Sequence, residues 1–221
     1  VYDRALDGRT LTFGVSGKLA DNDLVLYDRE TESEWKQSSG ICLSGEFAGE
    51  ALTVRPAATM TWDAFDEHYP DGEVLQQPGW GTADYTTDRF ADYMDNDHVS
   101  PGGDSRLRTG IDDWSFDFHP KALTLGLTVD GQTRGYPRPT VEAAGGVVSD
   151  TLGDTDVVVF STDAGIFAYE GTRLAFEAID ENRFRADGTT WDAATGRSED
   201  GRALTRLPSR RLFAFTWRDD H

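Results

Sequence analysis

The sequence predicts a mainly β protein, an internally duplicated β-rich domain with a few short helices. Three observations predict this fold. Short apolar and β-branched runs recur along the 221 residues, each bounded by turn-forming Gly, Asp, Asn or Pro. Helical patterns are few and short. Two stretches near the ends of the chain also share an order of residues, as a repeat would.

The expected strands follow turn signals in chain order. Asp7-Gly8 precedes the strand-like residues 10–13, and residues 24–27 form the next run. Residues 157–160 are continuously apolar, which is typical of a strand buried on both faces. Two hairpins are also expected. They are residues 123–129 with 133–136 around Asp130-Gly131, and residues 166–169 with 174–179 around Glu170-Gly171-Thr172.

Two short helices are expected. Residues 61–68 begin at Thr61, whose side chain can cap a helix, and carry acidic residues in the first turn. Residues 140–144 are stopped by Gly145-Gly146. Residues 72–105 are rich in Gly, Pro, Asp and Tyr and predict a long irregular connection, with a turn of helix around residues 87–94.

The repeat is carried by similar strings in both parts of the chain. From their order we expect a first repeat in residues 1–110, which includes the long connection and lacks its N-terminal segment. A second repeat is expected in residues 111–221, and the two form one compact unit. The matching strings are Asp7-Gly8-Arg9-Thr10-Leu11-Thr12-Phe13, Tyr27-Asp28 and Thr61-Trp62, against Glu170-Gly171-Thr172-Arg173-Leu174-Ala175-Phe176, Trp191-Asp192 and Thr216-Trp217.

The charge composition indicates a protein adapted to high salt. Forty Asp and Glu against 21 Lys and Arg give a formal net charge of -19, and only Lys18, Lys36 and Lys121 are lysines. Such a charge repels itself in dilute buffer. At 1 M salt the screening length falls to about 3 Å, so most of this repulsion disappears. The same charge argues against a nucleic-acid partner, because an acidic surface repels phosphates.

No cofactor, metal site or membrane span is expected. The sequence has no phosphate-binding loop or dinucleotide fingerprint, and no apolar run of the roughly 20 residues that a membrane helix needs. Cys42 has apolar neighbours, which favours a buried thiol over a reactive one. Because the chain opens at Val1 without Met, we expect that an upstream segment and any targeting signal were removed, which leaves the compartment open. His68, His98, His119 and His221 lack zinc spacing, and Asp95-Asn96-Asp97 with Asp104 lacks the register of a calcium loop.

One string resembles a known family. Tyr27-Asp28-Arg29-Glu30-Thr31-Glu32-Ser33-Glu34-Trp35 is similar to the aspartate-arginine-x-threonine-x-serine-x-tryptophan hallmark of domain-of-unknown-function family 3179, which is frequent in halophilic archaea. Arg134-Gly135-Tyr136-Pro137 resembles a second element of that family. The resemblance implies a haloarchaeal-type member and supports the expected architecture, but it implies no chemistry.

Asp28, Arg29, Thr31 and Ser33 form the densest patterned polar cluster, and it has two interpretations. Asp28 can close a turn by accepting hydrogen bonds from residues two and three positions on. Alternatively, Arg29 holds an anion between the hydroxyl groups, which makes the cluster a ligand site. The turn is favoured because Asp192 and Thr195 repeat it, whereas Ala193 replaces the arginine.

The leading hypothesis for function is a non-enzymatic binding or structural module, because no catalytic motif is found. One alternative is an enzyme with a site around Asp28 and Arg29 that the missing upstream segment completes. Another is a carbohydrate-binding module that uses exposed tryptophans, although the repeated positions of Trp62 and Trp217 favour a place in the core.

Overall fold

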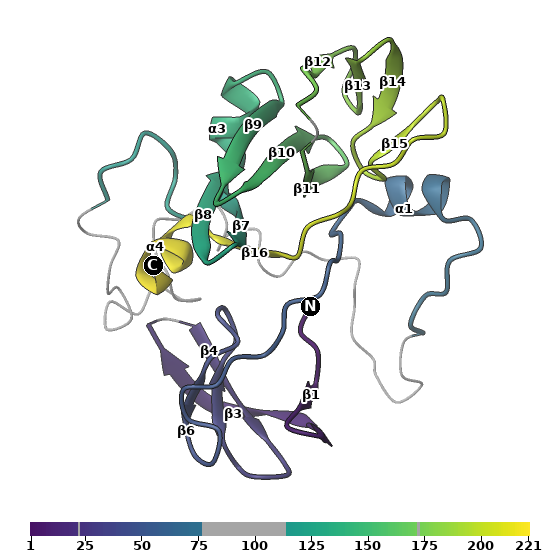
Figure 1. Ribbon diagram of the computed structural model, residues 1–221. Helices are drawn as coiled ribbons and strands as arrows, with labels where there is room; N and C mark the ends of the chain where they lie inside the picture. The colour runs from purple at the N-terminus through teal and green to yellow at the C-terminus, as the bar shows by residue number, and fades with distance from the viewer. Residues whose placement is uncertain (22, 77–113, 172) are drawn as a thin grey trace.

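The computed structural model describes residues 1–21, 23–76, 114–171 and 173–221, and the fold within them is mainly β with three short helices (Figure 1). The predicted mainly β class with a few short helices is therefore confirmed. None of these three helices is both long and apolar enough to cross a membrane. Several predictions lie outside the described residues, namely the repeat boundary at 110/111, the turn of helix at 87–94, His98 and the acidic cluster at 95–104.

The N-terminal part forms one hairpin and one four-stranded antiparallel sheet. In the hairpin, Asp7 and Gly8 adopt φ angles of 48° and 72°, as a tight turn between two strands requires. A small core of Leu11, Trp35 and Cys42 with their neighbours packs against the sheet. The strands are β1 (Ala5–Leu6), β2 (Arg9–Thr10), β3 (Phe13–Ala20), β4 (Asp23–Asp28), β5 (Glu34–Lys36) and β6 (Cys42–Ser44).

The C-terminal part forms three further antiparallel sheets, with strand orders β16-β7-β8, β11-β10-β9 and β12-β13-β14-β15. The hairpin predicted at Asp130-Gly131 joins β7 and β8 and is confirmed. The strands are β7 (Leu123–Val129), β8 (Gln132–Pro137), β9 (Val147–Leu152), β10 (Thr155–Thr162), β11 (Gly165–Glu170), β12 (Glu177–Ala178), β13 (Arg183–Ala186), β14 (Thr189–Asp192), β15 (Arg197–Ser198) and β16 (Ser209–Phe213).

Strand β10 lies between two apolar cores, which explains its continuous apolar run. Successive side chains of a strand point to opposite faces. Val157 and Val159 belong to the core beneath β7 and α3 (Arg138–Ala143), while Val158 and Phe160 belong to the core shared with β13 and β14. The prediction of a strand buried on both faces is therefore confirmed.

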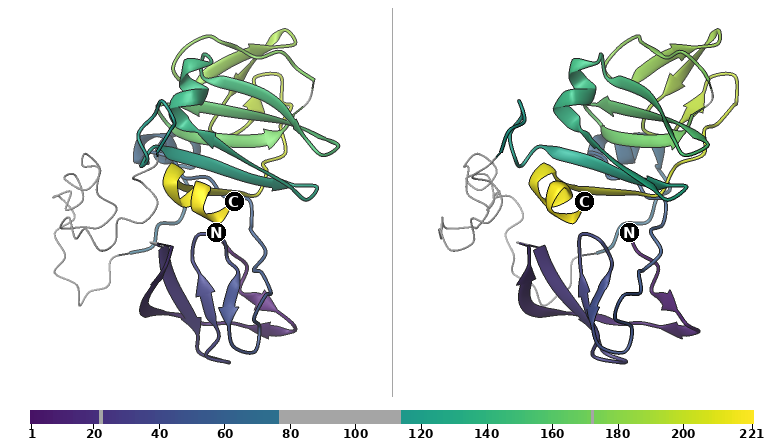
Figure 2. Two further views of the ribbon diagram at one scale, coloured as in Figure 1. Left: turned by 90° about the vertical axis from the view of Figure 1, so that its left-hand side faces the viewer. Right: turned by 60° about the vertical axis from the view of Figure 1, so that its left-hand side comes forward.

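The helices follow the sequence signals in two of three cases. Helix α1 (Trp62–His68) starts after Thr61, whose hydroxyl accepts a hydrogen bond from the backbone nitrogen of Ala64 at 3.4 Å. Helix α3 begins two residues before the predicted range and has Pro in its first turn. Helix α4 (Ala214–Asp220) was not predicted, because Phe213 offers no capping side chain. Figure 2 shows α4 between the N-terminal sheet and the β16-β7-β8 sheet.

The hairpin predicted around Glu170-Gly171-Thr172 is wrong. Strand β11 pairs with β10, and β12 pairs with β13. The outer side of β11 is occupied through Tyr169, which bridges to Arg206. The backbone nitrogen of Gly171 donates to the carbonyl of Asp156 at 2.6 Å, which directs the chain away from a return along β11.

The expectation that Trp62 belongs to the core is also wrong. Its side chain is 60% exposed and lies against Phe65 on the outside of α1, with 5.6 Å between ring centroids. Trp217 instead covers two glycines. A Cβ atom at Gly126 or Gly135 would lie 1.9 Å or 2.3 Å from its ring. Only glycine therefore leaves room for the indole to pack on β7 and β8.

Two parts of the chain share a set of backbone contacts. In each part, a buried tryptophan is followed by a glycine with positive φ. The backbone nitrogen of this glycine donates a hydrogen bond to the carbonyl oxygen of the residue four positions earlier. The backbone nitrogen of a downstream leucine then donates to the carbonyl oxygen of the glycine. These contacts relate Lys36 to Asp192, whereas the aligned sequences related Asp28 to Asp192. The matched bonds are Gly40 N to Lys36 O at 2.9 Å and Leu52 N to Gly40 O at 3.0 Å, against Gly196 N to Asp192 O at 2.9 Å and Leu204 N to Gly196 O at 2.8 Å.

Candidate functional site

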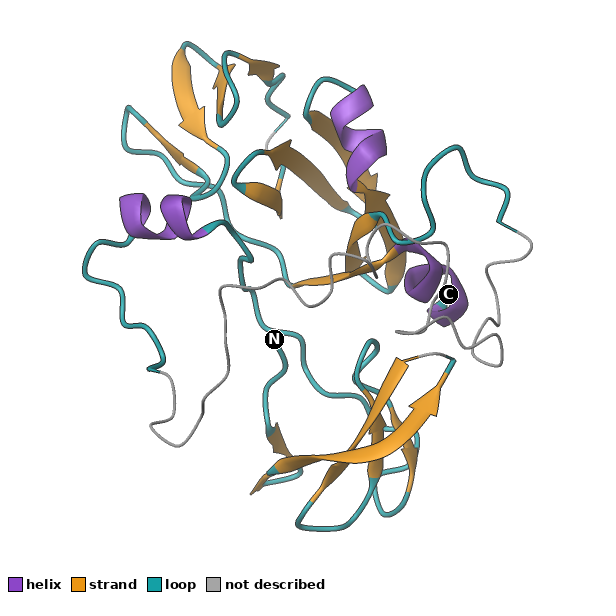
Figure 3. Cartoon of the chain, turned by 180° about the vertical axis from the view of Figure 1, so that it is seen from behind, coloured by secondary structure: helices purple, strands orange, loops and turns teal. Residues whose placement is uncertain are grey.

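The strongest candidate site is a pocket of about 430 Å³ between α1, the turn that joins β10 and β11, and the ends of β13 and β14. Figure 3 shows α1 beside this group of strands, away from the N-terminal sheet. We call it the acidic pocket, because carboxylates dominate its lining. The side chains that matter below are those of Asp63, Glu67, His68, Asp163, Asn182 and Asp192.

Helix α1 presents one face to the acidic pocket. Asp63, Ala64, Glu67 and His68 all line it, as the spacing of an α-helix dictates. Ala64 is buried in the same core as Phe160 and Trp191. The first turn is also tied down by its backbone, because the nitrogen of Thr61 donates to the carbonyl of Ala164 at 3.0 Å. The carboxylates of α1 are thus held over the β10–β11 turn.

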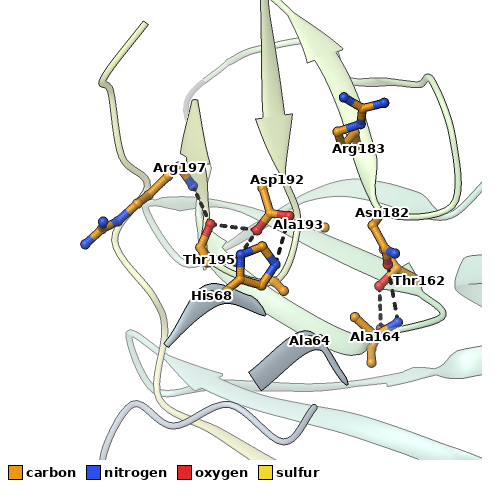
Figure 4. Close-up of polar contacts among 12 residues, drawn as sticks. Ala64, His68, Thr162, Ala164, Asn182, Arg183, Asp192, Ala193, Thr195 and Arg197 are labelled. Carbon is orange, nitrogen blue, oxygen red and sulfur yellow. Dashed lines mark hydrogen bonds and ion pairs between the residues drawn. The ribbon is translucent and has the colours of Figure 1, made fainter. Parts of the chain in front are cut away.

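Asp192, the last residue of β14, is fixed by a turn and faces a histidine of α1 (Figure 4). Its Oδ1 accepts hydrogen bonds from the backbone nitrogen of Thr195 at 2.8 Å and from the Thr195 hydroxyl at 2.6 Å. Its Oδ2 lies 3.4 Å from Nε2 of His68. Because the Thr195 hydroxyl donates to Asp192, that hydroxyl is not held as a nucleophile by His68.

The opposite rim is organised by two residues of the loop before β13. Oδ1 of Asn182 accepts a hydrogen bond from the backbone nitrogen of Ala164 at 3.3 Å, which links the two loops (Figure 4). Asp180 pairs with Arg183 at 2.6 Å. The hydrogen bond from Arg183, with others from nearby backbone nitrogens, lowers the pKa of Asp180 below its ordinary value. This exposed pair neutralises itself and leaves the other carboxylates unbalanced.

The net charge of the lining is strongly negative. It holds five carboxylates, from Asp63, Glu67, Asp163, Asp180 and Asp192, against one guanidinium, from Arg183, and one imidazole. Among the described residues, no basic side chain forms an ion pair with Asp63, Glu67 or Asp163. No three described His, Cys, Asp or Glu side chains are grouped to hold a metal ion. This arrangement suits a ligand that spreads positive charge or N–H donors over several oxygens.

The structure brings three of the four predicted site residues together, but in a closed network away from the acidic pocket. Asp28 and Ser33 are both 0% exposed. Oδ1 of Asp28 accepts a hydrogen bond from the backbone nitrogen of Thr31 at 2.6 Å, and its Oδ2 accepts one from Nε1 of Trp35 at 2.9 Å. The Thr31 and Ser33 hydroxyls lie 2.7 Å apart. Burial alone would raise the pKa of Asp28, but the hydrogen bonds outweigh burial and lower it.

Arg29, the fourth predicted residue, lies apart from this network. Its guanidinium stands over the ring of Tyr27, 5.6 Å from the centroid. Within the described part of the chain it forms no ion pair. The geometry of the cluster is therefore that of a closed turn with an exposed arginine beside it.

The predicted environment of Cys42 is confirmed. Its thiol is buried and donates to the carbonyl oxygen of Ser44 at 3.2 Å. Burial raises the pKa of this thiol above its ordinary value, which disfavours the reactive thiolate.

The acidic pocket could not be assembled from the sequence. No sequence pattern joins His68, which lacks zinc spacing with the other histidines, to Asp192, which forms its turn with Thr195. The only available signal was the acidic face of α1, in which Asp63 and Glu67 are one helical turn apart.

The chain matches a family model over its whole length. The model is described as "Protein of unknown function (DUF3179)" and covers residues 1–221, so the chain belongs to this family. No curated protein and no solved structure matches the chain.

Proposed function

We propose that this chain is a non-enzymatic binding module and that the acidic pocket takes a small organic cation, such as an alkyl diamine or a guanidine. One observation carries the proposal: five carboxylates and a single guanidinium share one pocket of about 430 Å³. Pockets of roughly 300–1,000 Å³ are the usual size for small-molecule sites.

The pocket chemistry favours recognition of charged N–H groups. Hydrogen bonds between ammonium or guanidinium donors and carboxylates are shorter and stronger than neutral ones. Asp163, Asp63 and Glu67 are exposed, so solvent screens each contact and each adds only about 0.2–1 kcal/mol. Affinity would come from several oxygens acting on one ligand rather than from one dominant contact.

The surroundings support binding over catalysis. The Thr195 hydroxyl is used by Asp192, and both Asp28 oxygens accept hydrogen bonds within their own turn. An enzyme centred on Asp28 and Arg29 would have to open that turn first. A carbohydrate-binding face draws less support, because Trp35 and Trp191 are buried and, among the described tryptophans, only Trp62 on α1 is exposed, so the described tryptophans form no row of exposed rings.

Calorimetric titration with 1,4-diaminobutane, in a fixed KCl concentration, tests the proposal. Its neutral counterpart, 1,4-butanediol, has the same length and no charge. We expect the diamine to bind at least about tenfold more tightly than the diol, because only the diamine forms charge-assisted hydrogen bonds. Equal binding of the two, or no binding of the diamine, would overturn the proposal.

Helix α1 supplies a matched pair of variants for the same titration. Glu67→Gln removes a carboxylate from the pocket lining, whereas Asp66→Asn removes one from the same helix outside the lining. We expect Glu67→Gln to weaken diamine binding about threefold and Asp66→Asn to leave it unchanged. Equal weakening in both variants would mean that only the net charge of the protein is being sensed.

We also propose that the chain is a salt-adapted, haloarchaeal-type member of its family without a nucleic-acid partner. The formal net charge of -19 and the three lysines support this proposal. Thermal unfolding followed from 0.2 M to 2 M KCl should show a steady rise of the melting temperature, because screening removes self-repulsion. A flat or falling melting temperature would contradict it.

An internal duplication is the final part of the proposal. The matched contacts after Trp35 and Trp191 support it, as do the bridges from Tyr2 to Val54 and from Tyr169 to Arg206. A duplication in this register pairs Lys36 with Asp192. Aligned sequences of family members should then show the two tryptophans as equivalent. An alignment that instead equates Asp28 with Asp192 would reject this register.

A further inference from the structure

A second pocket lies where the N-terminal strands meet β16, and its chemistry is the reverse of the first. Its volume is about 470 Å³, and its lining includes Tyr2, Ser38, Thr59, Arg210 and Arg211. None of the described residues that line it is acidic. A pocket lined by two arginines and no carboxylate is unexpected in a chain with 40 Asp and Glu against 21 Lys and Arg. We call it the junction pocket.

Ser38 provides the most specific observation. It is 2% exposed, and its Oγ has no hydrogen-bond partner among the described residues. Its backbone, by contrast, is fully used. The nitrogen donates to Oδ2 of Asp23 at 2.6 Å, and the carbonyl accepts from the Tyr2 hydroxyl at 2.7 Å. An unsatisfied buried hydroxyl costs about 1–3 kcal/mol, and a ligand acceptor in this pocket would remove that cost.

The two arginines lack carboxylate partners. Arg210 donates to the carbonyl of Ser38 at 3.3 Å, contacts Nε2 of His221 at 2.9 Å and lies over the ring of Trp217. The side chain of Arg211 forms no ion pair and no hydrogen bond with the described residues. Arg211 is itself exposed at the rim of the pocket, and partial desolvation of its guanidinium, together with the nearby charge of Arg138, lowers its pKa below the ordinary value. An anion would relieve this repulsion.

The rest of the lining is suited to both ends of an amphiphilic molecule. Burial raises the pKa of Tyr2 to about 12, so its phenol stays protonated at neutral pH. Most of the remaining lining is apolar and includes residues from the cores of both parts of the chain. It contains Leu26, Ala57, Ala58, Leu125, Ile166 and Leu212.

We propose that the junction pocket binds a small amphiphilic oxyanion, a carboxylate or phosphate group on an apolar body, with the Arg211 guanidinium and the Ser38 hydroxyl as donors. Arg211 supplies a planar pair of N–H groups that matches two oxygens of either group. The apolar wall accepts the body of the ligand. This site is separate from the acidic pocket and does not depend on the function proposed for that pocket.

Titration with three probes tests the proposal on the unmodified chain. Benzoate and phenyl phosphate carry the two candidate anionic groups on one ring, and benzyl alcohol is their neutral counterpart. We expect at least one anion to bind about tenfold more tightly than the alcohol, and the stronger of the two identifies the preferred group. If neither anion exceeds the alcohol, the proposal fails without the need for any variant.

Variants then locate the site. Arg211→Gln should weaken binding of the better anion about tenfold, and Ser38→Ala about threefold or more. Arg185→Gln, an exposed arginine of β13 outside the lining, is the matched control and should change nothing. Equal losses in Arg211→Gln and Arg185→Gln, or an unchanged affinity in Ser38→Ala, would overturn the assignment. Melting temperatures of all three variants show whether each remains folded.

The two pockets can be told apart in one experiment. Glu67→Gln, which is expected to weaken diamine binding, should leave the affinity for the anion unchanged. Saturating 1,4-diaminobutane should not displace the bound anion. Competition between the diamine and the anion would show that both report on one surface, and it would overturn the junction pocket as a separate site.

Discussion

Lys36 and Asp192 occupy corresponding positions after two buried tryptophans, yet they carry opposite charges. Each side chain pairs with a helix residue from elsewhere in the chain, that of Lys36 with one in α4 and that of Asp192 with one in α1. Nζ of Lys36 lies 2.7 Å from Oδ1 of Asp220 in α4, and Oδ2 of Asp192 lies 3.4 Å from Nε2 of His68 in α1. The first pair is 7% and 2% exposed, and the second is 23% and 21% exposed. Similar backbone frameworks thus support a buried ion pair in one place and an open acidic pocket in the other.

This difference shows that similar backbone hydrogen bonds do not determine the sign of the side-chain charge at these two positions or the degree to which it is buried. At Lys36, burial alone would lower the pKa of the ammonium group, but the Asp21 and Asp220 carboxylates outweigh burial and raise it. A charge that is buried with its partner stabilises the fold through that partner and is not available to bind a ligand. At Asp192 the carboxylate is only partly covered, so it remains available to a ligand.

The largest predicted effect breaks the buried pair. Lys36→Met should lower the free energy of unfolding by about 3–5 kcal/mol, because Asp220 is then left buried without its partner. Urea unfolding at a fixed KCl concentration measures this loss. The double variant Lys36→Met with Asp220→Leu should recover most of it, since the remaining carboxylate, Asp21, is exposed and no buried charge is left. A loss below about 1 kcal/mol in the single variant would show that Asp220 is well solvated.

The next effect compares the two aspartate turns. Asp28→Asn should cost about 2–3 kcal/mol, because the fully buried carboxylate accepts hydrogen bonds from Thr31 and Trp35. Asp192→Asn should cost only about 1 kcal/mol, because its carboxylate is partly exposed. Urea unfolding of both variants checks the order, and equal losses would remove the contrast.

The pH dependence of Asp28 sharpens this comparison. Its pKa is lowered in the folded protein. Its stabilisation is therefore complete above the unfolded pKa of about 3.9 and is lost as the pH falls through the lower folded value. The stabilities of the wild type and Asp28→Asn, measured by urea unfolding from pH 7 downward, should therefore converge below pH 4. A gap that stays constant in acid would mean that the loss arises from packing.

The smallest effect is expected at the open pair. His68→Gln should change the free energy of unfolding by less than about 1 kcal/mol, because both partners are partly solvated. Melting curves at neutral pH measure the change. A loss as large as that of Lys36→Met would place the Asp192 pair in a structural role and weaken the case for a ligand pocket.

The sequence was most informative where a local chemical rule decides the backbone. Asp130-Gly131 adopts positive φ angles at both positions and closes its hairpin, and Thr61 caps α1. It failed where packing outweighs local preference. Helix α4 lacks a cap and is held by backbone bonds to Pro120 and Ala122 and by Trp217, which fits the space above Gly126. The chain after Glu170 reads like a hairpin, yet β11 takes its partners from elsewhere.

The candidate sites divide along the same line. The sequence by itself determined the acidic composition, the mainly β fold and the turn at Asp28, because each depends on residues close together in the chain or on simple counts. Only the tertiary structure decided that His68 faces Asp192, and that Ser38 meets Arg210 across a pocket. These partners are far apart in sequence, and no local pattern encodes which helix or strand will cover which sheet end. That choice is made by the packing of buried side chains such as Ala64 and Trp35.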